Sequence, residues 1–304
     1  MAAFNNVPSV TNTTAAVFIP ELWSDEIIAA YKQNLVMANL VSKMSFKGKK
    51  GDTLHIPKPT RGNASVKASE AQVTLQAATE TEVQVLVNKH YEYSRLIEDI
   101  TEVQALSSLR KFYTGDAGYA LAKQVDTDLI QLGRDAQGGN GTIAYDKAVI
   151  GGDGSTLYTG ANESAITDAG IRKVIQTLDD ADVPMDGRVL VLPPVARNVM
   201  MGLARFTEQA FVGEVGGGNT IRNGQIGNVY GVMVYVSTNC ETATGDARIG
   251  MMFHKDAFVL AEQMGVRSQT QYKQEYLATL FTSDMLYGVK ELRDEAAVAI
   301  AMSA

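Results

Sequence analysis

The stretch IEDITEVQALSSLRKFYTGDAGYALAKQVDTDLIQLGRDA, residues 97–136, carries the strongest periodic signal in this 304-residue chain. Its apolar residues recur every three or four positions, which places their side chains on one face of an α-helix. They are Ile97, Ile100, Val103, Leu106, Leu109, Tyr113, Ala117, Ala120, Leu121, Val125, Leu129 and Leu132. The pattern predicts one helix about 55 Å long, or two nearly collinear ones, with a bend expected at Gly115 and Gly118.

The segment before this helix alternates apolar and polar residues, as a strand with one covered face does. Its odd-numbered apolar residues are Val73, Leu75, Val83, Val85 and Val87. A turn and a short strand, GDTLHIPKP at residues 51–59, open the segment. Because an isolated two-stranded ribbon is marginal in water, we expect the rest of the chain or other subunits to cover its apolar face.

The first 19 residues have no clear period and are rich in Asn, Thr, Ala and Val, which is typical of an extended arm. A short helix is predicted from Glu21 to about Gln33, with Pro20 at its start. The only tryptophan, Trp23, lies in this helix, where a packing role is the simplest interpretation.

After the long helix, the sequence predicts a compact α/β region. Glycine clusters at 138–141 and 151–154 indicate a domain boundary. Thr167 can cap a helix, residues 189–192 read as a buried strand, and Pro194 opens a second helix through Leu203. Further predictions are a glycine-rich excursion at 211–228, strands at 229–236, 248–253, 258–261 and 265–271, alternation over 280–286, and a buried strand at 296–302.

Composition excludes several classes of function. The net charge of -7 argues against tight, nonspecific binding of nucleic acid. Cys240 is the only cysteine, and the three histidines, His55, His90 and His254, have no metal-ligand spacing. The N-terminus lacks the pattern of a secretory signal, and no apolar run is long enough to cross a bilayer, so no membrane partner is expected.

Glycine-rich stretches offer the best candidates for a nucleotide site, and they fail on spacing. Residues 213–218, GEVGGG, lack the GxGxxG frame, and residues 46–51, FKGKKG, lack the Walker A frame. No HExxH, GxSxG or kinase motif occurs. We therefore predict no catalytic, cofactor-binding or metal-binding residues, and no cofactor.

The order of these elements resembles the Hong Kong 97-type coat-protein fold of tailed phages, an α+β fold. The resemblance spans nearly the whole chain and is nearest to short-tailed (podovirus) phage capsid proteins. The stretches that carry it are FIPELWSDE (18–26), GDTLHIP (51–57), LIEDI (96–100), ALAKQVDTDL (120–129) and GQIGNVYGVMVYVS (224–237).

The resemblance implies a division of the chain into four parts. These are an N-terminal arm with a short helix at 1–48, an extended β-hairpin loop at 49–95, a peripheral domain at 96–159 and 246–304 with a spine helix at 97–136, and an axial domain at 160–245. The glycine-rich residues 211–224 would lie near the symmetry axes of hexamers and pentamers, where a flexible backbone can adopt several conformations.

The resemblance also implies the partners. The chain would assemble with itself as hexamers and pentamers, with a portal protein at one vertex and packaged DNA as a weakly contacted cargo. The resemblance leaves open whether decoration proteins bind the shell. A separate scaffolding protein is expected, because the arm begins within a few residues of Met1. Some relatives join subunits through an isopeptide bond; Lys58 and Lys67 lie in the matching loop, but no motif identifies a reacting pair.

The sequence thus predicts a non-enzymatic major capsid protein, assembled in the host cytoplasm into the icosahedral shell of a virion around double-stranded DNA. One alternative with the same fold is an encapsulin-like nanocompartment, which encloses proteins. The alternative from another class is a small-ligand-binding α/β enzyme, which would need a convergent polar pocket.

Overall fold

The computed structural model describes most of the chain from Val36 onward. The described residues are 36–45, 47–48, 50–58, 62, 64–70, 72–73, 75, 81–104, 109–134, 149–154, 164–203, 227–240 and 247–303. The predicted arm, the predicted helix at 21–33, Trp23 and the glycine-rich residues 211–226 lie outside this part. No helix of the described residues is long and apolar enough to cross a membrane.

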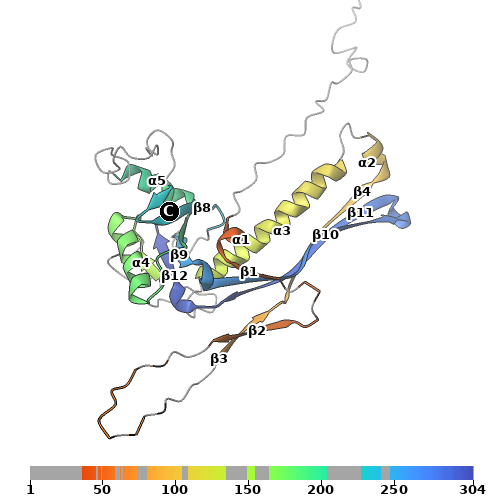
Figure 1. Ribbon diagram of the computed structural model, residues 1–304. Coiled ribbons are helices and arrows are strands. Elements are labelled where there is room, and N and C mark those ends of the chain that lie inside the picture. The colour runs from red at the N-terminus through yellow and green to blue at the C-terminus, as the bar shows by residue number, and fades with distance from the viewer. Residues whose placement is uncertain are drawn as a thin grey trace, which may run out of the picture.

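A long, twisted ribbon forms the first of the two bodies of the molecule (Figure 1). It is a four-stranded sheet in the order β1 (Ser42–Ser45), β10 (Phe258–Lys273), β11 (Ala278–Glu291) and β4 (Lys89–Glu98). β1 runs parallel to β10, whereas the other two pairs are antiparallel. The 3-10 turn η4 (Gln274–Tyr276) joins β10 to β11 at the tip.

Helix α3 (Leu109–Arg134) lies along one face of the ribbon (Figure 1), as the apolar stripe requires. Leu121, Val125 and Leu129 are buried in a cluster with residues of the ribbon, among them Met285 and Tyr287. Burying such side chains contributes roughly 1.5–3 kcal/mol each before entropic costs, so this stripe fixes the helix on the sheet.

The start of the predicted helix is corrected by the structure. Ile97 and Glu98 end strand β4, and a short helix, α2 (Asp99–Gln104), precedes α3. Pairing decides this, because Ile97 and Glu98 are opposite Thr279 and Ala278 of β11. α3 runs without interruption through Gly115 and Gly118, where a bend was expected.

A six-stranded sheet forms the second body of the molecule. Its order is β5 (Val149–Gly151), β12 (Ala297–Met302), β9 (Arg248–His254), β6 (Arg188–Leu192), β8 (Val232–Val236) and β7 (Asn228–Val229). β9 and β12 therefore belong with β6 and β8, although the sequence placed 246–304 in the other domain. The predicted boundary at 245/246 cuts through one sheet. β12 is buried throughout, as the apolar run at 296–302 predicted.

Helices α4 (Asp168–Asp180) and α5 (Pro194–Gly202) pack on this sheet. Thr167 caps α4 as predicted, since its hydroxyl oxygen accepts from the backbone N–H of Gly170 at 3.1 Å. Pro194 begins α5, and Leu203 follows its end instead of lying inside it. Three further short elements are α1 (Met37–Leu40), η3 (Lys255–Ala257) and η5 (Asp294–Ala296).

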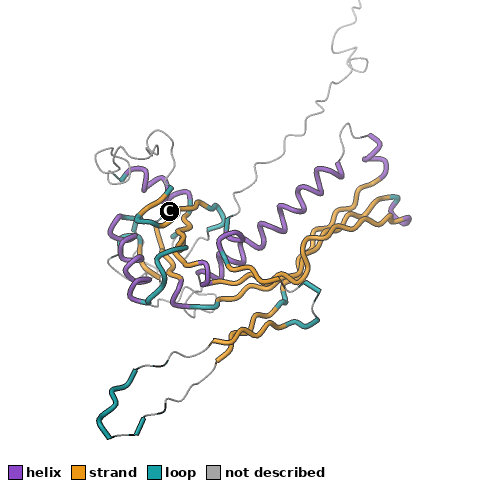
Figure 2. The backbone as a smooth tube through the Cα atoms, viewed as in Figure 1, coloured by secondary structure: helices purple, strands orange, loops and turns teal. Residues whose placement is uncertain are grey.

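A two-stranded hairpin, β2 (Thr53–Lys58) and β3 (Thr81–Leu86), leaves the ribbon as a separate projection (Figure 2). Val85 and Val87 at its root are buried against Val259 and Ala261 of β10. The hairpin therefore ends near Val87, and β4 is part of the ribbon, whereas the sequence extended the loop to residue 95.

Candidate assembly surfaces

The described residues contain no group of three His, Cys, Asp or Glu side chains that could hold a metal ion. Each histidine lies beside a carboxylate: His55 beside Glu82, His90 beside Asp284, and His254 beside Asp256. Cys240 is buried, and burial raises the pKa of its thiol to about 12, which keeps it protonated at neutral pH. The surfaces of the described residues that could contact another chain are the distal hairpin and the tip of the ribbon.

The distal part of the hairpin is the first such surface. Val66 is 101% exposed, Leu75 is 92% exposed and Val73 is 64% exposed. The apolar residues of the hairpin thus differ along its length, because Val85 and Val87 at the root are buried against β10 whereas the distal ones are exposed. The described distal residues lie far from both bodies of the molecule (Figure 2), and the part of the chain that the structure describes leaves them largely uncovered.

The root of the hairpin is held close to the ribbon. The backbone N–H of Val87 donates to the carbonyl oxygen of Asp52 at 2.7 Å, and the side-chain amide of Gln263 donates to the carbonyl of Gly51 at 3.0 Å. Gly288 of β11 lies directly beneath Leu86. A Cβ atom at position 288 would lie 2.9 Å from the carbonyl carbon of Leu86, so only glycine permits this approach.

The tip of the ribbon is the second surface, and it lies at the opposite end of the ribbon from the six-stranded sheet (Figure 1). Its exposed apolar and aromatic residues are Leu96, Ile100, Tyr272, Tyr276 and Leu277. Several large apolar side chains exposed at one end of an element are more typical of a contact site than a single exposed one is.

The tip is also conformationally fixed. Leu277 has a left-handed backbone, with φ of 45°, which is costly for a leucine. Its carbonyl oxygen accepts from the backbone N–H of Asp99, and the Tyr272 hydroxyl donates to Asp99 Oδ2 at 2.8 Å. These bonds tie the turn to the start of α2, so Leu277 is presented in one arrangement.

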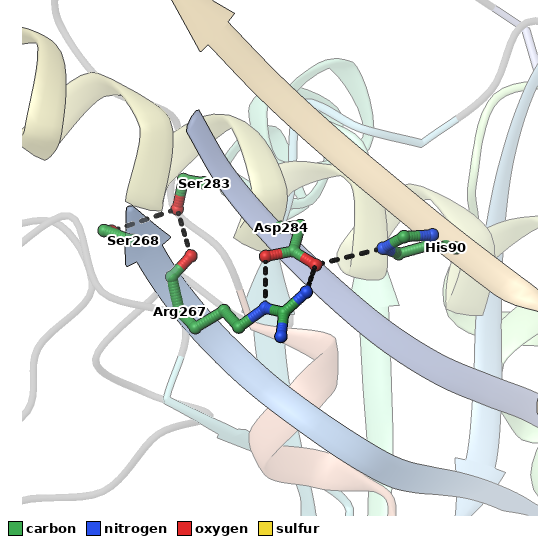
Figure 3. Close-up of polar contacts among 5 residues, drawn as sticks. All are labelled: His90, Arg267, Ser268, Ser283 and Asp284. Atoms are coloured by element: carbon green, nitrogen blue, oxygen red, sulfur yellow. Dashed lines mark hydrogen bonds and ion pairs between the residues drawn. The ribbon is translucent and has the colours of Figure 1, made fainter. Parts of the chain in front are cut away.

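Three adjacent strands of the ribbon are joined by a charged network (Figure 3). Arg267 of β10 forms a bidentate pair with Asp284 of β11, with Nε and one Nη donating at 2.7 and 2.9 Å. His90 of β4 contacts Asp284 Oδ2 at 3.1 Å on the other side. The network follows two register shifts of β10, between Glu262 and Arg267, and it pins the strands beyond them.

The network makes ribbon stability depend on pH. The hydrogen bond from Arg267 holds the pKa of Asp284 below its usual value of 3.8. A lowered folded-state pKa contributes stability that is complete above the ordinary value and is lost as the pH falls below it. We expect Asp284→Asn to lower the free energy of unfolding at pH 7, and the difference from the wild type to shrink below pH 3.8.

Urea unfolding at pH 7, 5 and 3 would measure this dependence. Glu92→Gln is the matched control, because Glu92 is opposite Asp284 in register but exposed. A deficit of Asp284→Asn that stays constant across this range would contradict the assignment of the ion pair as its cause.

The comparisons with known proteins point in one direction. A family model described as phage capsid protein matches residues 99–300 of the chain. No curated protein matches the sequence. The matched range contains the long helix, the ribbon strands β10 and β11, and all of the six-stranded sheet except the last two residues of β12.

Solved structures share the whole architecture. A structure from Mycobacterium phage Che8 is 26% identical with a TM-score of 0.74, and the match covers 93% of this chain and 97% of that one. The capsid structure of cyanophage P-SCSP1u is 16% identical with a TM-score of 0.77, covering 98% and 99%. The capsid asymmetric unit of cyanophage Pam1 is 12% identical with a TM-score of 0.73, covering 100% and 99%.

Proposed function

This chain belongs to the phage capsid protein family, and from that membership we propose that it is the major capsid protein that assembles as hexamers and pentamers into an icosahedral shell around double-stranded DNA. Its location is the virion capsid. The role is structural and not catalytic, which accords with the acidic balance of the chain, because a container need not bind its cargo tightly.

The observation that carries the proposal is the exposed distal hairpin. Val66, Val73 and Leu75 are exposed in a segment that leaves both bodies of the subunit. Burying these three side chains on a neighbour would contribute about 4.5–9 kcal/mol in total before the entropy of ordering. The hairpin lying across an adjacent subunit explains why one chain presents this surface uncovered.

The division of the subunit follows the two bodies of the fold. We assign the ribbon with α3 to the peripheral domain and the six-stranded sheet with α4 and α5 to the axial domain. The partners are further copies of the chain, a separate scaffolding protein and a portal protein at one vertex, with assembly in the host cytoplasm. We further propose that the N-terminal arm, predicted from the sequence at residues 1–48, changes its position as the shell matures.

Electron microscopy of the protein, expressed with and without its neighbouring phage genes, tests the proposal. We expect large closed shells. Their size should be uniform only when a scaffolding protein is present. Regular shells from this chain alone would reject the separate scaffold. A monomer or small oligomer under both conditions would reject the shell itself.

The contents of the particles separate the nearest alternative. An encapsulin-like nanocompartment shares the fold and would hold an enzyme cargo, whereas a phage capsid holds DNA after packaging. Nuclease-resistant DNA in purified particles supports the capsid, and a protein cargo in place of DNA would support the nanocompartment.

A further inference from the structure

One buried carboxylate on the spine helix contacts two distant parts of the chain. Asp126 lies in α3 between the core residues Val125 and Leu129, and only 1% of it is exposed. A buried charge is costly unless its hydrogen-bonding capacity is satisfied. The role of Asp126 therefore follows from its hydrogen-bond partners.

The first partners are at the root of the N-terminal segment. Asp126 Oδ1 accepts from the backbone N–H groups of Val36 and Met37, at 3.0 and 2.8 Å. These amides begin α1, a four-residue helix whose preceding residue, Val36, supplies no side-chain cap. So short a helix has little stability of its own, and Asp126 replaces the missing cap from 89 and 90 positions away.

The second partner is on the six-stranded body. The side-chain amide of Asn239 donates to Asp126 Oδ2 at 2.7 Å. Asn239 lies in the turn after β8, whose start is anchored to β6 because the backbone N–H of Ser237 donates to the carbonyl of Leu192. Both carboxylate oxygens are thus used, one toward the arm root and one toward the axial domain.

We propose that Asp126 is a positioning residue that fixes the arm root, residues 36–37, to the spine helix and to the axial-domain turn 237–240 at the same time. The arm root and the turn bind the two oxygens of one carboxylate, so a displacement of the turn from the helix disturbs the anchor of the arm. The consequence for shell assembly rests on the proposed function: the axial domain and the arm change position together.

A reciprocal exchange of the two side chains tests the contact directly. Asn239→Asp places two acceptors face to face, which leaves a buried carboxylate without its donor. Adding Asp126→Asn restores a donor and an acceptor with the roles reversed, and the new amide oxygen still accepts from residues 36 and 37. The double variant should therefore behave better than the single one. Asn239→Ala is the milder variant if Asn239→Asp does not fold.

Hydrogen exchange of the unassembled, full-length subunit is the measurement, read by mass spectrometry on peptides covering residues 36–41. We expect Asn239→Asp to accelerate exchange there at least about tenfold, Asn239→Ala by a few-fold, and the double variant to return to within about threefold of the wild type. Val174→Ala is the control, since Val174 is buried in the separate core of α4 and should leave residues 36–41 unchanged.

Three results would overturn the proposal. Unchanged exchange at 36–41 in both Asn239 variants would separate the turn from the arm root. Equal acceleration in Val174→Ala would reduce the effect to general stability. If the double variant exchanged as fast as Asn239→Asp alone, a direct contact between residues 126 and 239 would be rejected. Failure of the wild type to form shells would instead reject the proposed function, because the exchange measurement uses the unassembled subunit.

Discussion

A subunit whose distal hairpin is removed should remain soluble and folded but form no closed shells. Lys58 and Thr81 are the last paired residues of β2 and β3, so residues 59–80 can be replaced by Asn-Gly, which closes a two-residue hairpin turn. Val85 and Val87 keep their packing on β10. Thermal unfolding should therefore match the wild type, while sedimentation and electron microscopy should find no particles.

A milder variant separates loss of the contact from loss of length. Substituting Val66, Val73 and Leu75 by serine keeps the hairpin intact and removes its exposed apolar surface. We expect few or unstable shells, with the folded subunit unchanged, since all three side chains are mostly exposed. Normal shells from the deletion variant would refute the assignment of the hairpin as an intersubunit contact.

The features that the sequence predicted well are those that local spacing determines. The stripe from Leu109 to Leu132 predicts α3, because helix periodicity is a property of neighbouring residues. The cap at Thr167 and the buried strand at 189–192 are similarly local, and all three agree with the structure. Each needs only the few residues that precede or follow it.

The features that sequence reasoning missed depend on pairing between distant residues. Ile97 has helical spacing to Ile100, yet its pairing with Thr279 keeps it in a strand. The expected boundary at 245/246 falls inside the six-stranded sheet, because β9 pairs with β6, about 60 positions earlier in the chain. Alternation in the hairpin predicted a face, but not which half of that face the chain itself covers.

The candidate surfaces were only partly accessible from the sequence. An exposed hairpin was expected because an isolated two-stranded ribbon is marginal in water. The tip and the Arg267–Asp284–His90 network, in contrast, require the register of three strands. His90 and Asp284 are 194 positions apart. For Asp126 the sequence contains one signal, because its carboxylate directly follows Val125 in the apolar stripe. A carboxylate at such a position is buried and needs hydrogen-bond partners.

Gly288→Ala should destabilise the subunit and redirect the hairpin, although the change adds a single methyl group. Gly288 does not have a positive φ, so space and not backbone conformation decides the outcome. The added Cβ would meet the carbonyl oxygen of Leu86 and would lie 3.1 Å from the Cα of Val87. Because these are backbone atoms, the root of the hairpin must move off β11, at a cost of about 1–3 kcal/mol.

The consequence for assembly is larger than the loss of stability. The hairpin is long, so a small rotation at Leu86 moves its distal residues by several times the displacement at the root. We expect Gly288→Ala subunits to be folded, with a lowered melting temperature, and to give few or irregular shells. Differential scanning calorimetry and electron microscopy of the same preparation would measure both effects.

Gly118→Ala is the matched control, because a Cβ atom there meets nothing within 4 Å. Gly118 lies inside α3, where alanine is favoured over glycine by about 0.5–1 kcal/mol, so this variant should be more stable than the wild type. The same substitution then has opposite signs at two positions, and only the contact with Leu86 distinguishes them. Equal stabilisation of both variants, with normal shells, would show that the hairpin root is not fixed by its approach to Gly288.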